Sequence, residues 1–253
     1  MLLEQHLIIP DWPAPPNVLV LQTTRLGGFS TAPYDGLNLG EHTGDDALRV
    51  AANRQSLNPY LPTEPLWLDQ VHGVTVVNTA HVSCLPQADA AYAKAANAVC
   101  TVLTADCLPV LLCDVAGSVV GAAHAGWRGL AAGVIEATVN TMNVPPERII
   151  AWLGPAIGPQ AFEVGDEVRT VFVAHDTNAS AAITPSPSSS QGEGKKYLTD
   201  IYLLARQRLQ ALGITQIYGA GYCTYSERER FFSYRRDGNT GRMASMIWLN
   251  TSA

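Results

Sequence analysis

Short apolar runs recur along the chain and predict buried β-strands. Each run spans four to seven residues and ends near a glycine, proline or polar residue, which is typical of strands that meet loops. The predicted strands cover residues 18–23, 66–70, 74–78, 99–104, 110–113, 119–123, 149–153, 214–218 and 243–249.

Apolar residues at helical spacing predict the remaining regular elements. The predicted helices cover residues 46–57, 130–142, 166–174 and 200–212. Asp45 and Asp46 supply an N-cap and a negative first turn for the first helix, and Thr199 or Asp200 can cap the last one. Gly213 ends the last helix, because glycine readily adopts the left-handed conformation at a helix C-terminus.

The order of these elements predicts an α+β fold in which one domain, residues 1–253, has a mixed β-sheet core flanked by helices. Several connections between strands are too short for the helical crossover that joins parallel neighbours. A chain of 253 residues fits one large domain. Residues 178–196 are rich in Ser, Pro and Gly, and we expect them to form a flexible surface loop within that domain.

Composition and charge disfavour nucleic acids and membranes as partners of this protein. Apolar residues make up 47% of the chain, which suits a substantial core, and the formal net charge of -6 disfavours a general nucleic-acid-binding surface. No run approaches the ~20 apolar residues that span a bilayer, and the first residues lack the basic start of a signal peptide. We expect a cytoplasmic protein that acts on small molecules, with no nucleic-acid or membrane partner and no obligate protein partner.

The cysteines do not form a recognisable disulfide or zinc-ribbon pattern. They are Cys84, Cys100, Cys107, Cys113 and Cys223. An odd count without a CxxC pair disfavours a disulfide framework. Cys100 and Cys113 lie in apolar runs, and we expect them to be small buried hydrophobic residues.

Three potential metal ligands lie at the ends of apolar runs. His72 occurs in LDQVHG, Cys107 in TADCLPVLL and His124 in HAGWRG. Two imidazoles and one thiolate can hold a zinc ion and leave its fourth position open, which is the arrangement of a catalytic site. The gaps of 35 and 17 residues are too long for a local motif. Spacing alone therefore fits equally well an inert core thiol and two ordinary hydrogen-bonded histidines.

Two polar residues have open roles. Asp106 precedes Cys107, and on a continuing strand its side chain faces away from that of Cys107. If the strand ends there, Asp106 can orient a ligand histidine, but a hydrogen bond to nearby backbone fits at least as well. His42 lies in the loop LGEHTGDD, and a place near the site is the less favoured interpretation.

The motifs closely resemble the bacterial laccase-domain family, whose members are called polyphenol oxidases, purine nucleoside phosphorylases or peptidoglycan editing factors. The matching stretches, in order along almost the whole chain, are TTRLGGFS (23–30), YDGLNLGEHTGDD (34–46), LDQVHG (68–73), TADCLPVLL (104–112), HAGWRG (124–129), WLGPAIGP (152–159) and FFSYRRDGNTGRMAS (231–245). The resemblance implies a single-domain α+β fold. It also implies that His72, Cys107 and His124 are catalytic residues that bind zinc.

The resemblance further implies phosphorolysis of adenosine, inosine, guanosine and methylthioadenosine, and deamination of adenosine. Zinc can lower the pKa of bound water from ~15.7 toward ~7, which deamination requires. Phosphorolysis requires an anion pocket, for which Arg25, Arg128 and Arg235 are the candidates; Arg236 fits a packing role better. The candidates for stacking on a purine are Tyr34, Trp127, Phe231 and Phe232, although aromatic residues near glycines more often belong to the core.

Two other activities remain open. The first is a hydrolase that edits peptidoglycan precursors by removing L-Ser from UDP-MurNAc-L-Ser. The second is copper (Cu²⁺)-dependent oxidation of polyphenols. Copper chemistry fits worse, because six histidines without an HxH pair cannot supply a three-copper cluster and an electron-entry copper. The nucleoside enzyme is therefore the favoured interpretation.

Overall fold

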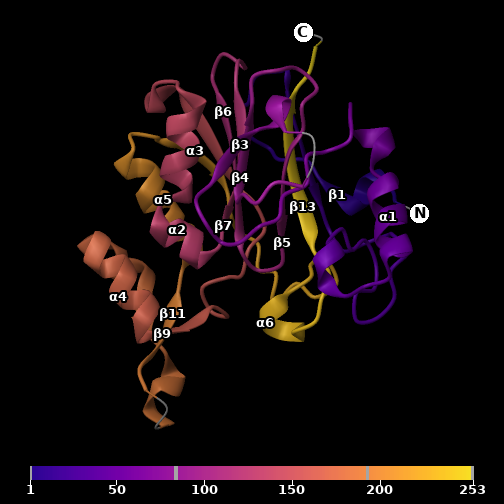
Figure 1. Cartoon of the computed structure of the whole chain (residues 1–253). Helices are drawn as coiled ribbons and strands as arrows, with labels where there is room; N and C mark the ends of the chain where they lie inside the picture. The colour runs from indigo at the N-terminus through magenta and orange to yellow at the C-terminus, as the bar shows by residue number, and fades with distance from the viewer. Residues whose placement is uncertain (1, 83–84, 192–193, 252–253) are drawn as a thin grey trace.

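Two packed β-sheets form the centre of the protein (Figure 1). The computed structural model describes residues 2–82, 85–191 and 194–251. Within these ranges the larger, six-stranded sheet contains, in spatial order, β12 (Gln216–Gly219), β8 (Ile149–Leu153), β6 (Leu108–Asp114), β7 (Val120–Ala125), β4 (Ala90–Ala93) and β3 (Val76–Asn78). The two outer pairs are parallel and the inner pairs are antiparallel. The predicted mixed sheet and α+β class are confirmed.

The other strands form two smaller antiparallel sheets. The four-stranded sheet contains β1 (Leu7–Ile8), β2 (Val18–Thr23), β13 (Met243–Leu249) and β5 (Cys100–Thr104). The three-stranded sheet contains β10 (Ile183–Pro185), β11 (Lys196–Thr199) and β9 (Glu163–Gly165). In Figure 1 this last sheet lies below α4, at one end of the molecule.

The α-helices are α1 (Ala47–Gln55), α2 (Trp127–Ala132), α3 (Val134–Met142), α4 (Asp166–His175), α5 (Ile201–Ala211) and α6 (Tyr234–Asp237). Of these, α2, α3 and α5 lie on the side of the six-stranded sheet that points away from the four-stranded sheet, whereas α1 lies at the opposite side of the molecule (Figure 1). The short 3-10 helices are η1 (Glu4–His6), η2 (Glu41–Thr43), η3 (Asn58–Tyr60), η4 (Thr79–His81), η5 (Pro146–Arg148), η6 (Thr177–Ala182) and η7 (Pro187–Gln191). The predicted caps are present, since Asp46 accepts from the backbone of α1 and Asp200 from that of α5.

The central strands are apolar along their whole length because both of their faces are buried. On β6, Leu108, Val110 and Leu112 pack toward the helices, whereas Leu111 and Cys113 pack toward the four-stranded sheet. This alternation follows from the two-residue period of a strand. The chain passes from one layer to the other between the end of β5 and the start of β6.

Three predicted elements differ from the structure. Residues 66–70 make only isolated bridges, from Leu66 to Cys100 and from Asp69 to Gln87, and do not form a strand. The predicted helix 130–142 is two helices, because Gly133 adopts φ 98° between α2 and α3. Residues 178–196 contain η7, β10 and parts of η6 and β11, with Ala179 and Ile183 buried; residues 192–193 lie outside the described ranges.

Two further findings bear on the composition arguments. No helix of the described residues is long and apolar enough to cross a membrane. Cys100, Cys107, Cys113 and Cys223 are free thiols, and Cys100 and Cys113 are fully buried as expected. Cys84 lies outside the described residues.

Candidate metal centre

Strand pairing brings the three predicted ligands together. Cys107 lies in the turn between β5 and β6, and His124 lies near the end of β7. Since β6 and β7 are antiparallel, with Pro109 opposite His124, the start of β6 meets the end of β7. His72 comes from the loop before β3. His72, Cys107 and His124, which are far apart in the sequence, therefore meet at one end of the two sheets.

The distances within this cluster suit a single metal ion. The candidate ligand atoms of His72, Cys107 and His124 all lie within 4.8 Å of one another. Sγ of Cys107 is 3.8 Å from Nε2 of His72, and the two imidazole centroids are 4.7 Å apart. Around tetrahedral zinc, a sulfur and a nitrogen ligand are separated by about 3.6 Å. The donor set therefore fits zinc with little movement.

Asp89 holds both His124 and the loop that carries His72. Its fully buried carboxylate accepts from Nδ1 of His124 at 2.8 Å and from the backbone N–H groups of Val71, His72 and Gly73 at 3.1, 2.9 and 2.6 Å. Burial raises the pKa of Asp89, but the hydrogen bonds from His124 and Gly73 outweigh it and hold the pKa below its ordinary value. An ionised carboxylate fixes the proton on Nδ1 of His124, so Nε2 is the nitrogen free to bind a metal.

Charge coupling favours the thiolate form of Cys107. Burial raises the pKa of this thiol, but the charge and hydrogen bonds of His124 and His72 outweigh it and lower the pKa. The pKa of His124 is raised in turn: burial lowers it, and Cys107 and Asp89 raise it more. A thiolate is the form that binds a metal.

Asp106 shapes the turn that carries Cys107 and does not contact the histidines. Its backbone is left-handed at φ 88°, which is uncommon for a residue other than glycine. Its carboxylate accepts from Oγ1 of Thr224 at 2.6 Å and from the backbone N–H of Arg235 at 2.7 Å. Asp106 therefore hydrogen-bonds to backbone, which is one of the two roles considered for it, and the carboxylate that contacts His124 is Asp89. Sequence reasoning missed Asp89 because the alanine-rich β4 was not predicted as a strand.

The cluster opens into a cavity of about 500 Å³, a size typical of small-molecule sites. One wall is apolar and is formed by Trp127, Ile157, Phe162 and Ile201. A second wall is polar and is formed by His42, Gln70, Thr104 and Arg242. Arg128, Arg235 and Tyr234 also line the cavity and are exposed. The structure thus places His42 beside the cluster, which the sequence had not favoured.

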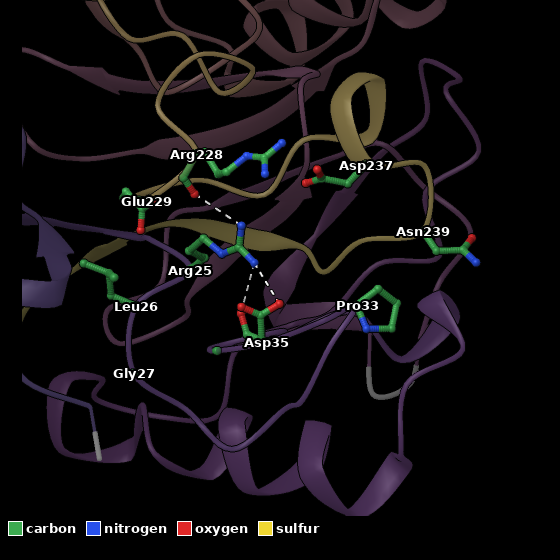
Figure 2. Close-up of a pocket in the computed structure, with 10 residues that line it drawn as sticks. Arg25, Leu26, Gly27, Pro33, Asp35, Arg228, Glu229, Asp237 and Asn239 are labelled. Carbon is green, nitrogen blue, oxygen red and sulfur yellow. Dashed lines mark hydrogen bonds and ion pairs between the residues drawn. The ribbon is translucent and has the colours of Figure 1, made fainter.

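The predicted arginines lie in three different environments. Arg128 and Arg235 line the cavity. Arg25 lines a separate cavity, where it pairs with Asp35 at 3.1 Å and donates to the carbonyl of Arg228 (Figure 2). Arg236 donates to the carbonyls of Thr224, Tyr225 and Phe231, which is the packing role expected for it.

The aromatic candidates separate in the same way. Trp127 lines the cavity, but Phe231 and Phe232 are fully buried in the core and Tyr34 donates to the carbonyl of Thr43. Phe162, which was not a candidate, lies on the apolar wall. It follows GPAIGPQA, a glycine- and proline-rich loop after a strand, and that context is the signal that could have found it.

The backbone of Gly126 packs closely against the cluster. A Cβ atom there would lie 2.9 Å from Sγ of Cys107 and 2.9 Å from Cδ2 of His72. We expect Gly126→Ala to separate these ligands and to weaken zinc binding about tenfold or more, measured by competition with a chromophoric chelator. Gly121→Ala, in β7, is the control: its Cβ would lie 3.2 Å from the side chain of Thr138 in α3, away from the cluster, and it should retain zinc affinity. Equal affinity in the Gly126 variant would show that the cluster tolerates the added methyl group.

Comparison with known proteins agrees with this architecture. The chain is 55% identical over 246 residues to purine nucleoside phosphorylase YfiH of Escherichia coli, covering 96% of this chain and 98% of the relative. It is 53% identical over 242 residues to a purine nucleoside phosphorylase of Pseudomonas aeruginosa, with the same coverage. A crystal structure of a Neisseria meningitidis protein matches 97% of this chain and 99% of its own, with a TM-score of 0.91 and 48% identity.

The family model also spans nearly the whole chain. Residues 19–250 match the model described as multi-copper polyphenol oxidoreductase laccase. The matched segment includes the ligand cluster, Asp89 and both walls of the cavity. The chain therefore belongs to the multi-copper polyphenol oxidoreductase laccase family.

Proposed function

We propose that this protein is a zinc-dependent purine nucleoside phosphorylase that also deaminates adenosine. The observation that carries the proposal is the His72–Cys107–His124 cluster, which opens into a cavity with an apolar aromatic wall and several cationic side chains. The names of the Escherichia coli and Pseudomonas aeruginosa relatives support the same reaction class.

The donor set favours zinc over multicopper chemistry. His72, Cys107 and His124 supply one thiolate and two imidazoles, and a zinc ion bound by them would act as a Lewis acid and activate water. Among the residues that the structure describes, no other group of three His, Cys, Asp or Glu side chains lies close enough together to hold a metal ion. A group of three donors suits one ion with an open position, whereas a multicopper oxidase needs several linked sites.

The cavity walls provide distinct contacts for a nucleoside. In phosphorolysis, a phosphate oxygen forms a bond to C1′ of the ribose, the C1′–N9 bond breaks, and the purine leaves with the electron pair and takes up a proton. Trp127 and Phe162 can pack against the purine, since aromatic faces stack on bases. Arg128 and Arg235 lie at the exposed side, where their charges can stabilise negative charge that develops on the substrate.

The test is a direct assay with metal analysis. The purified protein is expected to contain about one zinc ion per chain, to convert adenosine with phosphate to adenine and ribose-1-phosphate, and to convert adenosine alone to inosine. Parallel assays with UDP-MurNAc-L-Ser and with a phenol plus Cu²⁺ measure the two competing activities. A higher kcat/KM for either competitor than for adenosine with phosphate would overturn the proposal.

A further inference from the structure

The polar wall of the cavity carries a cationic side chain without a carboxylate partner. Arg242 immediately precedes β13, beside the end of β5, where Met243 pairs with Thr104. The Nη1 atom of Arg242 donates to the carbonyls of Thr240 at 2.9 Å and Gly241 at 3.1 Å. Among residues 2–82, 85–191 and 194–251, no carboxylate oxygen lies within 4.0 Å of its guanidinium. The remaining N–H groups of Arg242 are therefore available to a ligand.

A second donor shares this wall. His42 lines the cavity, and burial together with the charge of Arg242 lowers its pKa, which leaves a neutral imidazole with one N–H to donate. Thr104 also lines the cavity, but its Oγ1 is buried beneath the cavity surface.

Gln70, the fourth residue of this wall, is fully engaged. Its amide donates to the carbonyl of Leu103 at 2.9 Å and accepts from the N–H of Leu103 at 2.7 Å. These two bonds connect the loop that carries His72 to the end of β5. The groups left on the polar wall are a guanidinium and an imidazole N–H, both of which can donate to an oxyanion.

We propose that Arg242 and His42 form the subsite that binds inorganic phosphate. The assignment deepens the phosphorylase proposal and, as a role in catalysis, depends on it. The other arginines are less suited to this role: Arg128 is exposed and stacks on Trp127 at 4.4 Å, and Arg235 donates to the carbonyl of Glu163 at 2.8 Å. They remain candidates for contacts to the nucleoside.

The position of the subsite also suits the chemistry. Arg242 lies immediately before β13 of the four-stranded sheet and His42 lies in η2, whereas the apolar wall belongs to the core between the six-stranded sheet and its helices. The nucleophile and the base thus bind to different parts of the fold, with the ribose between them. In-line displacement at C1′ requires this separation of the attacking oxygen and the leaving purine.

The test measures phosphate binding separately from turnover. Inorganic phosphate is titrated into the zinc-loaded protein by calorimetry, and the KM values for phosphate and adenosine are measured in parallel. We expect Arg242→Gln to raise the phosphate Kd and KM about tenfold or more, because a charge-assisted hydrogen bond is lost. The KM for adenosine in the phosphate-free deamination reaction should change by less than about threefold.

Two further variants make the result specific. Arg242→Lys keeps the charge but lacks the planar fork, so it should bind phosphate with intermediate affinity; it also carries the test if the Gln variant does not fold. Arg148→Gln removes an arginine at the far end of β6, near Asp114, and is the matched control with unchanged phosphate affinity.

The outcomes separate the two proposals. Phosphate binding that depends on Arg242, without phosphorolysis by the wild-type protein, would retain the subsite and overturn the phosphorylase proposal. Active phosphorolysis with unchanged phosphate Kd and KM in both Arg242 variants would overturn the subsite alone. A wild-type protein that does not bind phosphate would also overturn the subsite.

Discussion

Replacing Cys107 with alanine is expected to remove bound zinc and to lower kcat/KM for adenosine phosphorolysis by about 10²–10³-fold or more, since metal catalysis contributes several kcal/mol. The substitution leaves two imidazoles, one of them exposed, as the remaining ligands. A neutral pair of ligands binds zinc far more weakly than a set that includes a thiolate. The measurements are the zinc content after dialysis and the initial rate of purine release.

Cys223→Ala is the matched control for this variant. Cys223 is also a half-buried free thiol, but it lines another cavity with Tyr222 and Glu227. We expect this control to retain zinc and activity. Stoichiometric zinc together with full activity in Cys107→Ala would contradict the assignment of the site.

The second large effect is expected from Asp89→Asn. The amide presents N–H donors or a single oxygen to four groups that all donate, so part of the network must break. His124 then loses the bond that orients Nε2 toward the cluster, and the loop around His72 loosens. We expect zinc affinity to fall about 10–100-fold and Tm to fall as well, as measured by chelator competition and thermal unfolding.

Asp114→Asn separates the loss of orientation from a general loss of stability. The buried carboxylate of Asp114 also accepts from backbone, at 2.6 Å from Ser118 and 3.0 Å from Val119, but it lies at the opposite end of β6. This control should lower Tm and leave zinc affinity unchanged. If both variants lose the same zinc affinity, Asp89 acts only through stability.

The same carboxylate gives the protein a pH dependence at the acid end. The pKa of Asp89 is lower in the folded protein than its ordinary value of 3.8. The unfolded chain therefore takes up this proton first as the pH falls. The stabilisation from Asp89 is fully present above about pH 4 and is lost as the pH falls through the pKa of the folded state. In Asp89→Asn this part of the pH dependence of unfolding should disappear.

Much of the fold follows from apolar periodicity. Residues 18–23, 149–153 and 243–249 are strands with the predicted bounds, because β-branched and large apolar side chains fill both faces of the two sheets. β4 escaped prediction because alanine has a low strand propensity, although three of its four residues are alanines packed between layers. The break at Gly133 was not predicted, because the helical spacing of apolar residues continues across Gly133 although its backbone is left-handed.

Part of the candidate site could also be predicted from the sequence, and part of it could not. The proximity of Cys107 and His124 was predictable because each lies beside the end of a strand that its sheet positions. The position of His72 was less so, because residues 66–70 form no strand and Asp89 holds the loop instead. The role of Arg25 was not predictable from the adjacent glycines. A Cβ atom on Gly36 would lie 1.9 Å from the carbonyl oxygen of Arg25, so close packing of this loop requires glycine there. Pairing of Arg25 with Asp35 depends on that loop and cannot be inferred from spacing.

The three-stranded sheet has a consequence for how substrate range can change. Phe162, which precedes β9, and Ile201, which follows β11, form part of the apolar wall. The backbone N–H of Thr199 donates to the carbonyl of Phe162 at 2.9 Å. In the proposed phosphorylase the root of this sheet would face the purine base, whereas the far end of the sheet projects away from the body of the molecule in Figure 1. Replacing this sheet with that of a relative is then expected to change which base is accepted and to leave His72, Cys107 and His124 unaltered. Evolution can vary selectivity and chemistry independently in such a scaffold.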